Sequence, residues 1–467
     1  MALYEKFKEG AKKRAIKKII YSLGDASNKN LLRTINLFEK FLPVDKSFQD
    51  AFYGVKNLVK ENHPSVGLIK RLLRDIDPNC KEKLVENLII KGFMTNQEIR
   101  ERVEKLGSFT PFVILTSPTM RCNLKCTGCY AANYSREDDL DIETFDKIVS
   151  QGEKMGTVFF IILGGEPLIM KQALFNLFRK HNKSYFQFYT NGTLLNEDVA
   201  RQLRDLGNVL PVLSVEGYEK ETDARRGKGT YAKVMNAMDL LKKYRVPFGY
   251  SVVITSKNAE LISSDEFIDF MINKGAYIGW HFLYMPLGHK PDLKLMPTPK
   301  QRKMLLDRWR IIRNTKSLFV VDFWNDAPAV GGCIAGKYYI HINSHGDVEP
   351  CIFSHFAVDN IKNKPLFEIM KSDFFKDLRS RQPFNENLYM PCMWIDNPEV
   401  SREIIKKYNC YPTHPGADVI LKDKKIKAGI DKYAKEVKRI YDPVWQAENK
   451  KSECNCGVCE SCREKRR

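Results

Sequence analysis

The stretch Phe112–Tyr130, FVILTSPTMRCNLKCTGCY, brings three cysteines into one loop directly after an apolar run of β-strand character. Cys122, Cys126 and Cys129 follow the spacing C-x3-C-x2-C, and the Asn, Thr and Gly residues between them disfavour a regular helix. A loop of this length can wrap one cuboidal iron–sulfur cluster and offer it three thiolates. Three thiolates for four irons leave one iron with a free coordination position, where a small molecule can bind and react.

The same cysteines would also fit a zinc knuckle or a set of three buried thiols. Buried cysteines are common, but they rarely lie this close together in one loop, which favours the cluster. At these residues the chain resembles the radical SAM superfamily, whose signature CxxxCxxC lies on the first loop of a partial α/β barrel. The resemblance implies a 4Fe-4S cluster on Cys122, Cys126 and Cys129 that binds S-adenosylmethionine (SAM) at its open iron.

The overall composition describes an ordinary globular chain. Its 467 residues, 43% hydrophobic and 28% charged, suffice for two or three domains with sizeable cores. No apolar run reaches about 18 residues, so no membrane-spanning segment is expected. Basic residues interrupt the first twenty positions, so no secretory signal is expected either. Twelve cysteines in such a chain are more typical of cluster thiols in a reducing cytoplasm than of disulfides, which predicts a cytoplasmic protein.

The net charge of +19 favours an anionic partner, although a generally lysine-rich proteome would explain it as well. Residues 1–108 are expected to form an all-helical N-terminal domain, because they show no strand-like alternation. Its first helix, Met1–Leu23, carries an apolar stripe and seven basic residues. This pattern predicts docking on an anionic membrane surface or an acidic carrier protein. The alternative is a solvated helix that packs on its own domain.

From Phe112 onwards the pattern alternates between strands and helices. Strands are expected at Phe112–Thr116, Val158–Leu163, Phe186–Tyr189, Val209–Val215, Phe248–Ile254 and Ile278–Tyr284. Amphipathic helices are expected around 142–155, 170–180, 196–206, 230–243 and 264–273. Six β/α repeats with buried strands predict a parallel sheet that curls toward a barrel. The count and order resemble the partial (β/α)6 barrel of the radical SAM enzymes, here over residues 109–318.

Motifs follow the second and third strands, at the end where parallel barrels gather their chemistry. The first motif is GGEP, in which the two glycines would allow a close approach to the backbone and the carboxylate could accept hydrogen bonds from an ammonium group. The resemblance implies that this motif binds the amino group of SAM. Asn191 lies in the Thr-Asn-Gly that ends the third strand, although Asn-Gly is also a common turn. These candidate residues are Gly164, Gly165, Glu166, Pro167 and Asn191.

The fourth strand ends with Ser214 and Glu216, which are two residues apart and therefore share a face, which we expect to be that of the ligand. The resemblance implies that Ser214 contacts the ribose or methionyl part of SAM. It also implies that Arg226, downstream, binds the carboxylate of SAM, for which the guanidinium fork is suited. The alternatives are a strand-end cap for Ser214 and a solvated side chain for Arg226. On the sixth strand, His281 stands among aromatic residues and is more typical of a packed histidine than of a substrate contact.

A second group of cysteines follows the barrel. Cys333 and Cys351 flank a predicted β-hairpin with the pattern C-x12-G-x4-C, and Cys392 lies in the later segment MPCMWIDNP. These residues resemble the auxiliary-cluster opening shared by the SPASM and Twitch extensions of radical SAM enzymes. A full SPASM domain also has a C-x2-C-x5-C-x3-C block, which this chain lacks, so a single-cluster, Twitch-like site over residues 319–410 is implied. Cys410, a histidine at 414 or an open iron would complete that site.

The tail, residues 411–467, is expected to be helical and basic and to end in four closely spaced cysteines. Four thiolates could hold zinc or an iron–sulfur cluster, and binding would then order the segment. The alternative is a disordered tail, because the segment is charged and has few apolar residues. The four cysteines are Cys454, Cys456, Cys459 and Cys462.

The resemblance implies an enzyme that cleaves SAM reductively to methionine and a 5′-deoxyadenosyl radical, which abstracts hydrogen from an unreactive C–H bond. It implies two 4Fe-4S clusters, SAM as cofactor, and an electron donor such as ferredoxin or flavodoxin. The N-terminal helix favours a lipid or carrier-bound acyl substrate at the membrane surface, and a peptide or protein substrate is the alternative. A zinc-dependent, basic nucleic-acid-binding protein would belong to another class. The six strand–helix units and the GGEP motif argue against it, so no nucleic-acid partner is expected.

Overall fold

The computed structural model describes residues 21, 24, 26–41, 46–135, 137, 139–288 and 290–454. The predicted N-terminal helix lies almost wholly outside these residues, and so do the tail cysteines beyond Cys454. Within the described ranges, no helix is both long enough and apolar enough to cross a membrane.

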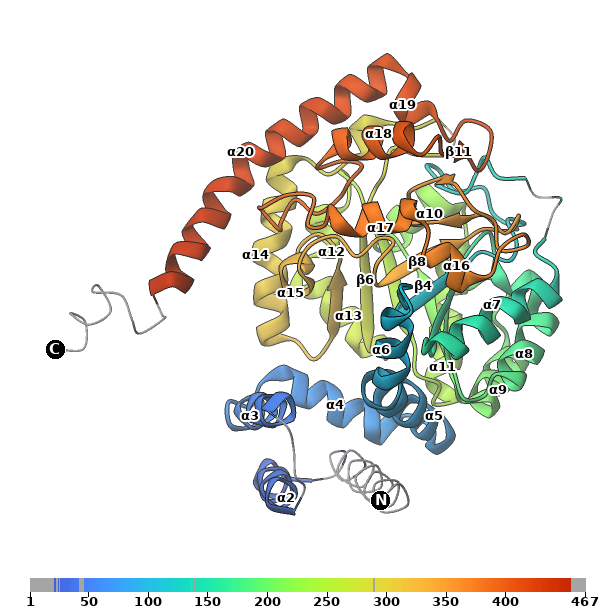
Figure 1. Ribbon diagram of the computed structural model, residues 1–467. Coiled ribbons are helices and arrows are strands. Elements are labelled where there is room, and N and C mark those ends of the chain that lie inside the picture. Colours follow the sequence, from blue (N-terminus) through green and yellow to red (C-terminus); the bar gives the residue numbers. More distant parts are fainter. Residues whose placement is uncertain are drawn as a thin grey trace.

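A nine-stranded sheet, ordered β7-β6-β5-β4-β3-β2-β1-β8-β9, organises the molecule (Figure 1). All neighbouring strands are parallel except β8 and β9, which pair antiparallel. The sheet curls with helices on its outside, which confirms the predicted partial α/β barrel. The strands are β1 Val113–Thr116, β2 Phe159–Ile162, β3 Tyr185–Thr190, β4 Val209–Ser214, β5 Gly249–Ile254, β6 Ile278–Leu283, β7 Phe319–Asp322, β8 Tyr339–Ile342 and β9 Val348–Glu349.

The strands are apolar on both faces because each face is covered. On β2, Phe160 and Ile162 are fully buried in the large core beneath the outer helices, whereas Phe159 and Ile161 face the inside of the curled sheet. The two faces alternate with the period of two that a strand imposes. The inside of the sheet is therefore lined by side chains and available for a ligand.

The outer helices lie where the sequence pattern predicts them. Caps fix their starts: the side chains of Asp141, Asn196 and Ser264 each accept a hydrogen bond from a main-chain N–H of the first turn. A short helix, α10 Glu219–Arg226, and a long one after the sixth strand were not among the predicted helices. The helices of the barrel are α7 Ile142–Met155, α8 Lys171–Lys180, α9 Glu197–Leu206, α10, α11 Thr230–Lys243, α12 Ala259–Ile262, α13 Asp265–Lys274 and α14 Pro299–Thr315.

The N-terminal region is helical throughout its described part, as predicted, although one segment is a π-helix. It packs against the end of the barrel at which the strands begin: the Arg71 guanidinium donates to the carbonyl oxygens of Ala276 (2.6 Å) and Ser317 (3.1 Å), which precede β6 and β7. The region therefore covers the end opposite the predicted site loops. Its helices are α2 Asn28–Phe41, α3 Lys46–Lys60, α4 Pro64–Asp75, α5 Pro78–Lys83, the π-helix η1 Leu84–Thr95 and α6 Gln97–Lys105.

The C-terminal region shares the barrel sheet. β7 pairs with β6, and the predicted hairpin, now β8 and β9, adds to the opposite edge with Tyr339 beside Val113. Two short helices follow the hairpin, and the Ser372 side chain caps the start of the second. The remaining elements are α15 Ala327–Val330, β10 Phe356–Ala357, α16 Leu366–Met370, α17 Asp373–Ser380, α18 Pro398–Lys407, β11 Tyr411–Pro412, α19 Val419–Lys422 and α20 Lys424–Cys454.

Candidate active site

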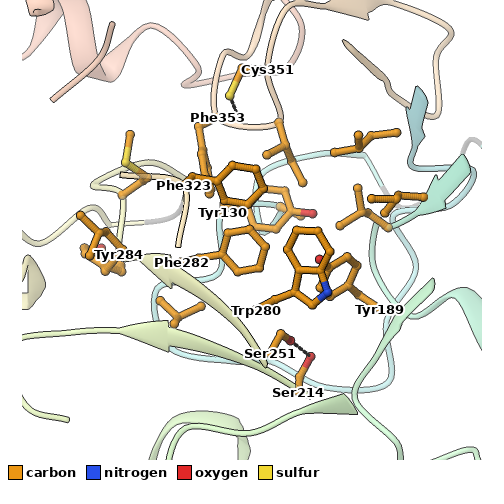
Figure 2. Close-up of a pocket in the computed structure, with 18 of the residues that line it drawn as sticks. Tyr130, Tyr189, Ser214, Ser251, Trp280, Phe282, Tyr284, Phe323, Cys351 and Phe353 are labelled. Carbon is orange, nitrogen blue, oxygen red and sulfur yellow. Dashed lines mark hydrogen bonds between the residues drawn. The ribbon is translucent and has the colours of Figure 1, made fainter. Parts of the chain in front are cut away.

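One cavity of about 1250 Å³ occupies the inside of the curled sheet. Two groups of cysteines line it, and all are free thiols. Figure 2 shows part of the wall, with Cys351 above a group of aromatic rings. The two groups are named here the loop cysteines, Cys122, Cys126 and Cys129, and the hairpin cysteines, Cys333, Cys351 and Cys392.

Gly164 and Gly165 hold the loop cysteines in place. The N–H of Gly165 donates to the carbonyl oxygen of Thr119 (2.8 Å), and the N–H of Glu166 donates to that of Arg121 (2.8 Å). A Cβ atom on Gly165 would lie 2.1 Å from the Arg121 oxygen, so only glycine fits. Both glycines line the cavity, but the close approach that they permit here is that of the cysteine loop itself.

Glu166 is turned away from the cavity and is fully buried. Its carboxylate accepts hydrogen bonds from the Thr190 hydroxyl (2.7 Å), the Asn191 N–H (2.7 Å) and the Leu168 N–H (3.1 Å). Burial raises its pKa, and these donors oppose the rise. Glu166 thus ties the end of β3 to the GGEP turn, and its predicted contact with the SAM ammonium group gains no support from this orientation. Pro167, also buried, begins the short 3₁₀ helix η2, Pro167–Met170.

Asn191 and Ser214 both line the cavity, as the sequence analysis expected of ligand-binding residues. The Asn191 amide donates to the Asn123 side-chain oxygen (2.8 Å) and lies 3.9 Å from the Cys122 sulfur. The Ser214 hydroxyl lies 3.3 Å from that of Ser251, on the neighbouring strand β5. Ser251 also lines the cavity and was not predicted, because the sequence alone does not show which strands are neighbours.

Glu216 holds two arginines at the cavity rather than facing it. One of its oxygens accepts hydrogen bonds from Arg226 (2.6 and 2.8 Å) and also pairs with Arg225. Both arginines line the cavity, while Glu216 does not. Two guanidinium groups on one carboxylate leave excess positive charge, which suits a ligand carboxylate. Burial raises the pKa of the Cys126 thiol, and these two arginines oppose that rise, which favours a thiolate ligand.

Three aromatic rings form a continuous wall inside the barrel. Trp280 and Phe282 project from β6, and Phe323 follows β7; their ring centroids are 5.5–6.3 Å apart and their planes are within 31° of one another. Figure 2 shows Tyr189 beside this aromatic wall. The sequence analysis noted the aromatic residues of β6, but Phe323 lies far away in the chain and was not singled out.

His281 lies on the other face of β6. It is fully buried and does not line the cavity; its Nε2 lies 3.0 Å from the Tyr250 hydroxyl, and its ring packs edge-on against Trp309. Burial lowers its pKa to about 3, so it is neutral at ordinary pH. His281 is thus a packed histidine with no path to a substrate in the cavity.

The hairpin cysteines come from three separate loops. Cys333 precedes β8, Cys351 follows β9, and Cys392 lies before α18. Burial raises the pKa of Cys333 to about 12 and that of Cys351 to about 11, so these thiols would lose their protons on binding a metal. Cys410 does not line the cavity, and its sulfur lies 4.0 Å from the Ile404 carbonyl oxygen. Its predicted role as a ligand gains no support here.

A buried polar network fastens the hairpin to the strand that carries the cysteine loop. The Ser117 hydroxyl lies 2.7 Å from His341 Nε2, and His341 Nδ1 lies 2.6 Å from the Glu349 carboxylate. The other carboxylate oxygen accepts a hydrogen bond from the Tyr134 hydroxyl (3.0 Å). These buried groups join the two cysteine-bearing regions, and their separation along the chain hid the network from sequence analysis.

The donor sets fit iron–sulfur clusters. Each group offers three thiols to one cavity, and glycines or hairpin turns hold the loops that carry them. Among the described residues, no three His, Cys, Asp or Glu side chains are placed to hold a single metal ion. A cuboidal cluster bonds each thiolate to a different iron and so accommodates a wider spacing.

Two family models match the chain. The model described as the radical SAM superfamily matches residues 116–268, and the model described as an iron–sulfur cluster-binding domain, SPASM, matches residues 333–393. The first range contains the loop cysteines and the second contains the hairpin cysteines. Cys410 lies beyond both.

Several known proteins are similar to this chain. The Fe-coproporphyrin III synthase of Methanosarcina barkeri is 21% identical over 61% of this chain and 81% of its own length. A cysteine-type anaerobic sulfatase-maturating enzyme of Clostridium perfringens is 32% identical over 33% of this chain and 47% of its own length. The crystal structure of Streptococcus suis SuiB bound to precursor peptide SuiA superposes with a TM-score of 0.52 at 17% identity, over 68% of this chain and 84% of SuiB. At that identity the structural likeness concerns the fold.

Proposed function

The chain is a radical SAM enzyme with a C-terminal iron–sulfur extension, and we propose that it abstracts hydrogen from an unreactive C–H bond of a peptide or protein. Its cofactors are a SAM-binding 4Fe-4S cluster, SAM itself and an auxiliary iron–sulfur cluster. The observation that carries the proposal is the single cavity lined by both the loop cysteines and the hairpin cysteines. A substrate group in that cavity lies between the two cysteine groups.

The residues of the chain bind, orient and exclude water. When bound at the loop cysteines, the cluster and SAM supply the reductive cleavage and the hydrogen-abstracting radical. Arg226 and Arg225 offer positive charge to a carboxylate, and Ser214 offers a hydroxyl on the same wall. The aromatic wall makes its side of the same cavity apolar, which limits the access of water. An electron donor such as ferredoxin or flavodoxin completes the proposed system.

The sulfatase-maturating relative supports a peptide or protein substrate, because its name states that it matures another protein. The SuiB structure, bound to a precursor peptide, points the same way for an enzyme of this fold. The reading of a lipid or carrier-bound acyl substrate rests on the N-terminal helix, which lies outside the described residues. The comparisons do not support a lipid or acyl substrate, so a peptide or protein is the substrate that we propose.

A second candidate is a tetrapyrrole. The Fe-coproporphyrin III synthase is matched over more of its length than the sulfatase-maturating enzyme is, 81% against 47%. The aromatic wall also suits a large planar ring system, because offset stacking favours ring faces.

Deuterium transfer distinguishes these substrates. Cells of the native host are grown in deuterated medium and separated into protein, peptide, lipid and tetrapyrrole fractions. Each fraction is incubated anaerobically with the reconstituted enzyme, unlabelled SAM and a reductant. Mass spectrometry then measures deuterium in the 5′-deoxyadenosine that forms. We expect label from the protein or peptide fraction, and we expect protease treatment of that fraction to remove it.

The variant in which all three loop cysteines are alanine is the control and should yield no label from any fraction. Label from the tetrapyrrole fraction alone would replace the peptide proposal by the second candidate. Label from the lipid fraction alone would indicate a lipid or acyl substrate instead.

A further inference from the structure

The hydroxyl of Tyr339 lies 2.7 Å from the sulfur of Cys351, within the same cavity. Cys351 also accepts a main-chain hydrogen bond from Phe353 (3.4 Å), and Cys392 accepts one from Trp394 (3.4 Å). Among the hydrogen bonds found in the described part of the chain, the Tyr339 contact is the only one that brings a hydroxyl to a hairpin cysteine. The sequence analysis did not single out this tyrosine.

The hairpin holds Tyr339 and Cys351 side by side. The N–H of Gly336 donates to the carbonyl oxygens of both Tyr339 (2.9 Å) and Pro350 (2.8 Å), so one donor clamps the two chain segments that carry these residues. Tyr339 pairs with Val113 across β8 and β1, and the side chains of both residues line the cavity. The position of the phenol is therefore set by the backbone of the hairpin and by the sheet.

The ring of Tyr339 also meets the aromatic wall. Its centroid lies 6.4 Å from that of Phe323, at an interplanar angle of 44°. Tyr339 thus has its hydroxyl at a hairpin cysteine and its ring at the apolar space proposed for the substrate. A phenylalanine at this position would keep the ring contact and lose only the hydroxyl.

A phenol donates readily to a thiolate, which can only accept, and hydrogen bonds to cluster sulfurs set reduction potentials. A donor stabilises the more negative, reduced form of a cluster and so raises its potential. We propose that Tyr339 donates a hydrogen bond to the Cys351 thiolate of the auxiliary cluster and thereby raises the reduction potential of that cluster. Tyr339 itself does not bind iron. This inference rests on the auxiliary cluster of the proposed function.

The test uses the full chain with C122A, C126A and C129A and with the four tail cysteines replaced by serine (C454S, C456S, C459S and C462S), so that the auxiliary cluster alone is measured. Y339F is added to this parent, and Y338F serves as the matched control, because Tyr338 is the neighbouring residue and is 38% exposed. Iron and sulfide per chain are determined, and the midpoint potential is measured by anaerobic redox titration followed by absorbance and electron paramagnetic resonance. We expect Y339F to keep the iron content of the parent and to lower the midpoint potential, and Y338F to leave both unchanged.

Three results would overturn the proposal. A midpoint potential equal to that of the parent would show that the contact does not act on the cluster. A loss of iron, or a three-iron signal, in Y339F alone would make the tyrosine an iron ligand or a structural requirement. A parent variant without iron would remove the auxiliary cluster from the proposed function itself, and the role of Tyr339 with it.

Discussion

Along β6, adjacent residues serve opposite faces of the sheet. Trp280 and Phe282 line the cavity, whereas His281 between them is sealed under Trp309 and Tyr250. From the sequence alone, the aromatic residues and the histidine look equally suited to a functional site. The alternation of side chains along the strand places them on opposite faces of the sheet. A histidine beside aromatic residues is informative about function only when its face of the strand is known.

His281 makes stability depend on pH. Its folded-state pKa is lowered to about 3 by burial, below the ordinary value of 6.5, so the unfolded chain takes up a proton first as the pH falls. This group therefore stabilises the fold above about pH 6.5 and loses that contribution below it. Between pH 7.5 and 5.5 the loss is about 1.4 kcal/mol, since one pKa unit corresponds to that energy.

Urea denaturation at pH 7.5 and 5.5 measures the effect, with H281Q as the comparison because glutamine does not titrate. We expect the free energy of unfolding of H281Q to fall by about 1.4 kcal/mol less than that of the parent over this interval. An identical pH dependence in both proteins would mean that His281 is not buried in its neutral form.

At the scale of elements, the six strands and five longer helices from residue 112 to 283 could be predicted because each has its own local signal, whereas the short helices α10 and α12 were not predicted. Apolar runs mark the strands, and periodic stripes mark the helices. The hairpin β8–β9 was also predicted, between Cys333 and Cys351. Its pairing beside β1 was not, because that contact joins residues more than 200 positions apart. The orientation of Glu166 and Glu216 away from the cavity depends on tertiary partners in the same way.

A buried ion pair links α14 to the loop of Cys392. Arg302 and Asp396 are almost fully buried and lie 2.6 Å apart, and Asp396 also accepts a hydrogen bond from the N–H of Cys392 (3.1 Å). R302M would leave a buried carboxylate without its partner and should lower the free energy of unfolding by about 3–5 kcal/mol. R302M/D396N should recover most of that loss, because the asparagine is neutral and still accepts from Cys392.

Guanidinium denaturation of the reconstituted protein measures these changes. The matched control is K303M on the same helix, because the exposed pair Lys303–Asp307 should contribute less than about 1 kcal/mol. Equal losses in R302M and K303M would contradict the role given to the buried pair. We also expect R302M to bind less iron at the hairpin cysteines, because the loop of Cys392 loses its anchor.

At the scale of the whole molecule, the fold brings two distant sets of thiols to one chamber. Tyr130 follows the last loop cysteine and Phe353 lies two residues after Cys351, and their rings meet edge to face at 6.2 Å. Figure 2 shows both rings among the residues that line the cavity. The described N-terminal helices cover the opposite end of the barrel, so among the described residues the strand ends that carry the site belong to the barrel and its C-terminal extension.

The central claim is that the loop cysteines hold the cluster that cleaves SAM. The most direct test is the anaerobic formation of 5′-deoxyadenosine from SAM and a reductant, measured by mass spectrometry for the reconstituted parent and for the C122A/C126A/C129A variant. The account predicts that the parent forms 5′-deoxyadenosine and methionine, and that the variant forms neither while it still holds iron at the hairpin cysteines. Formation of 5′-deoxyadenosine at the same rate by both proteins would contradict it.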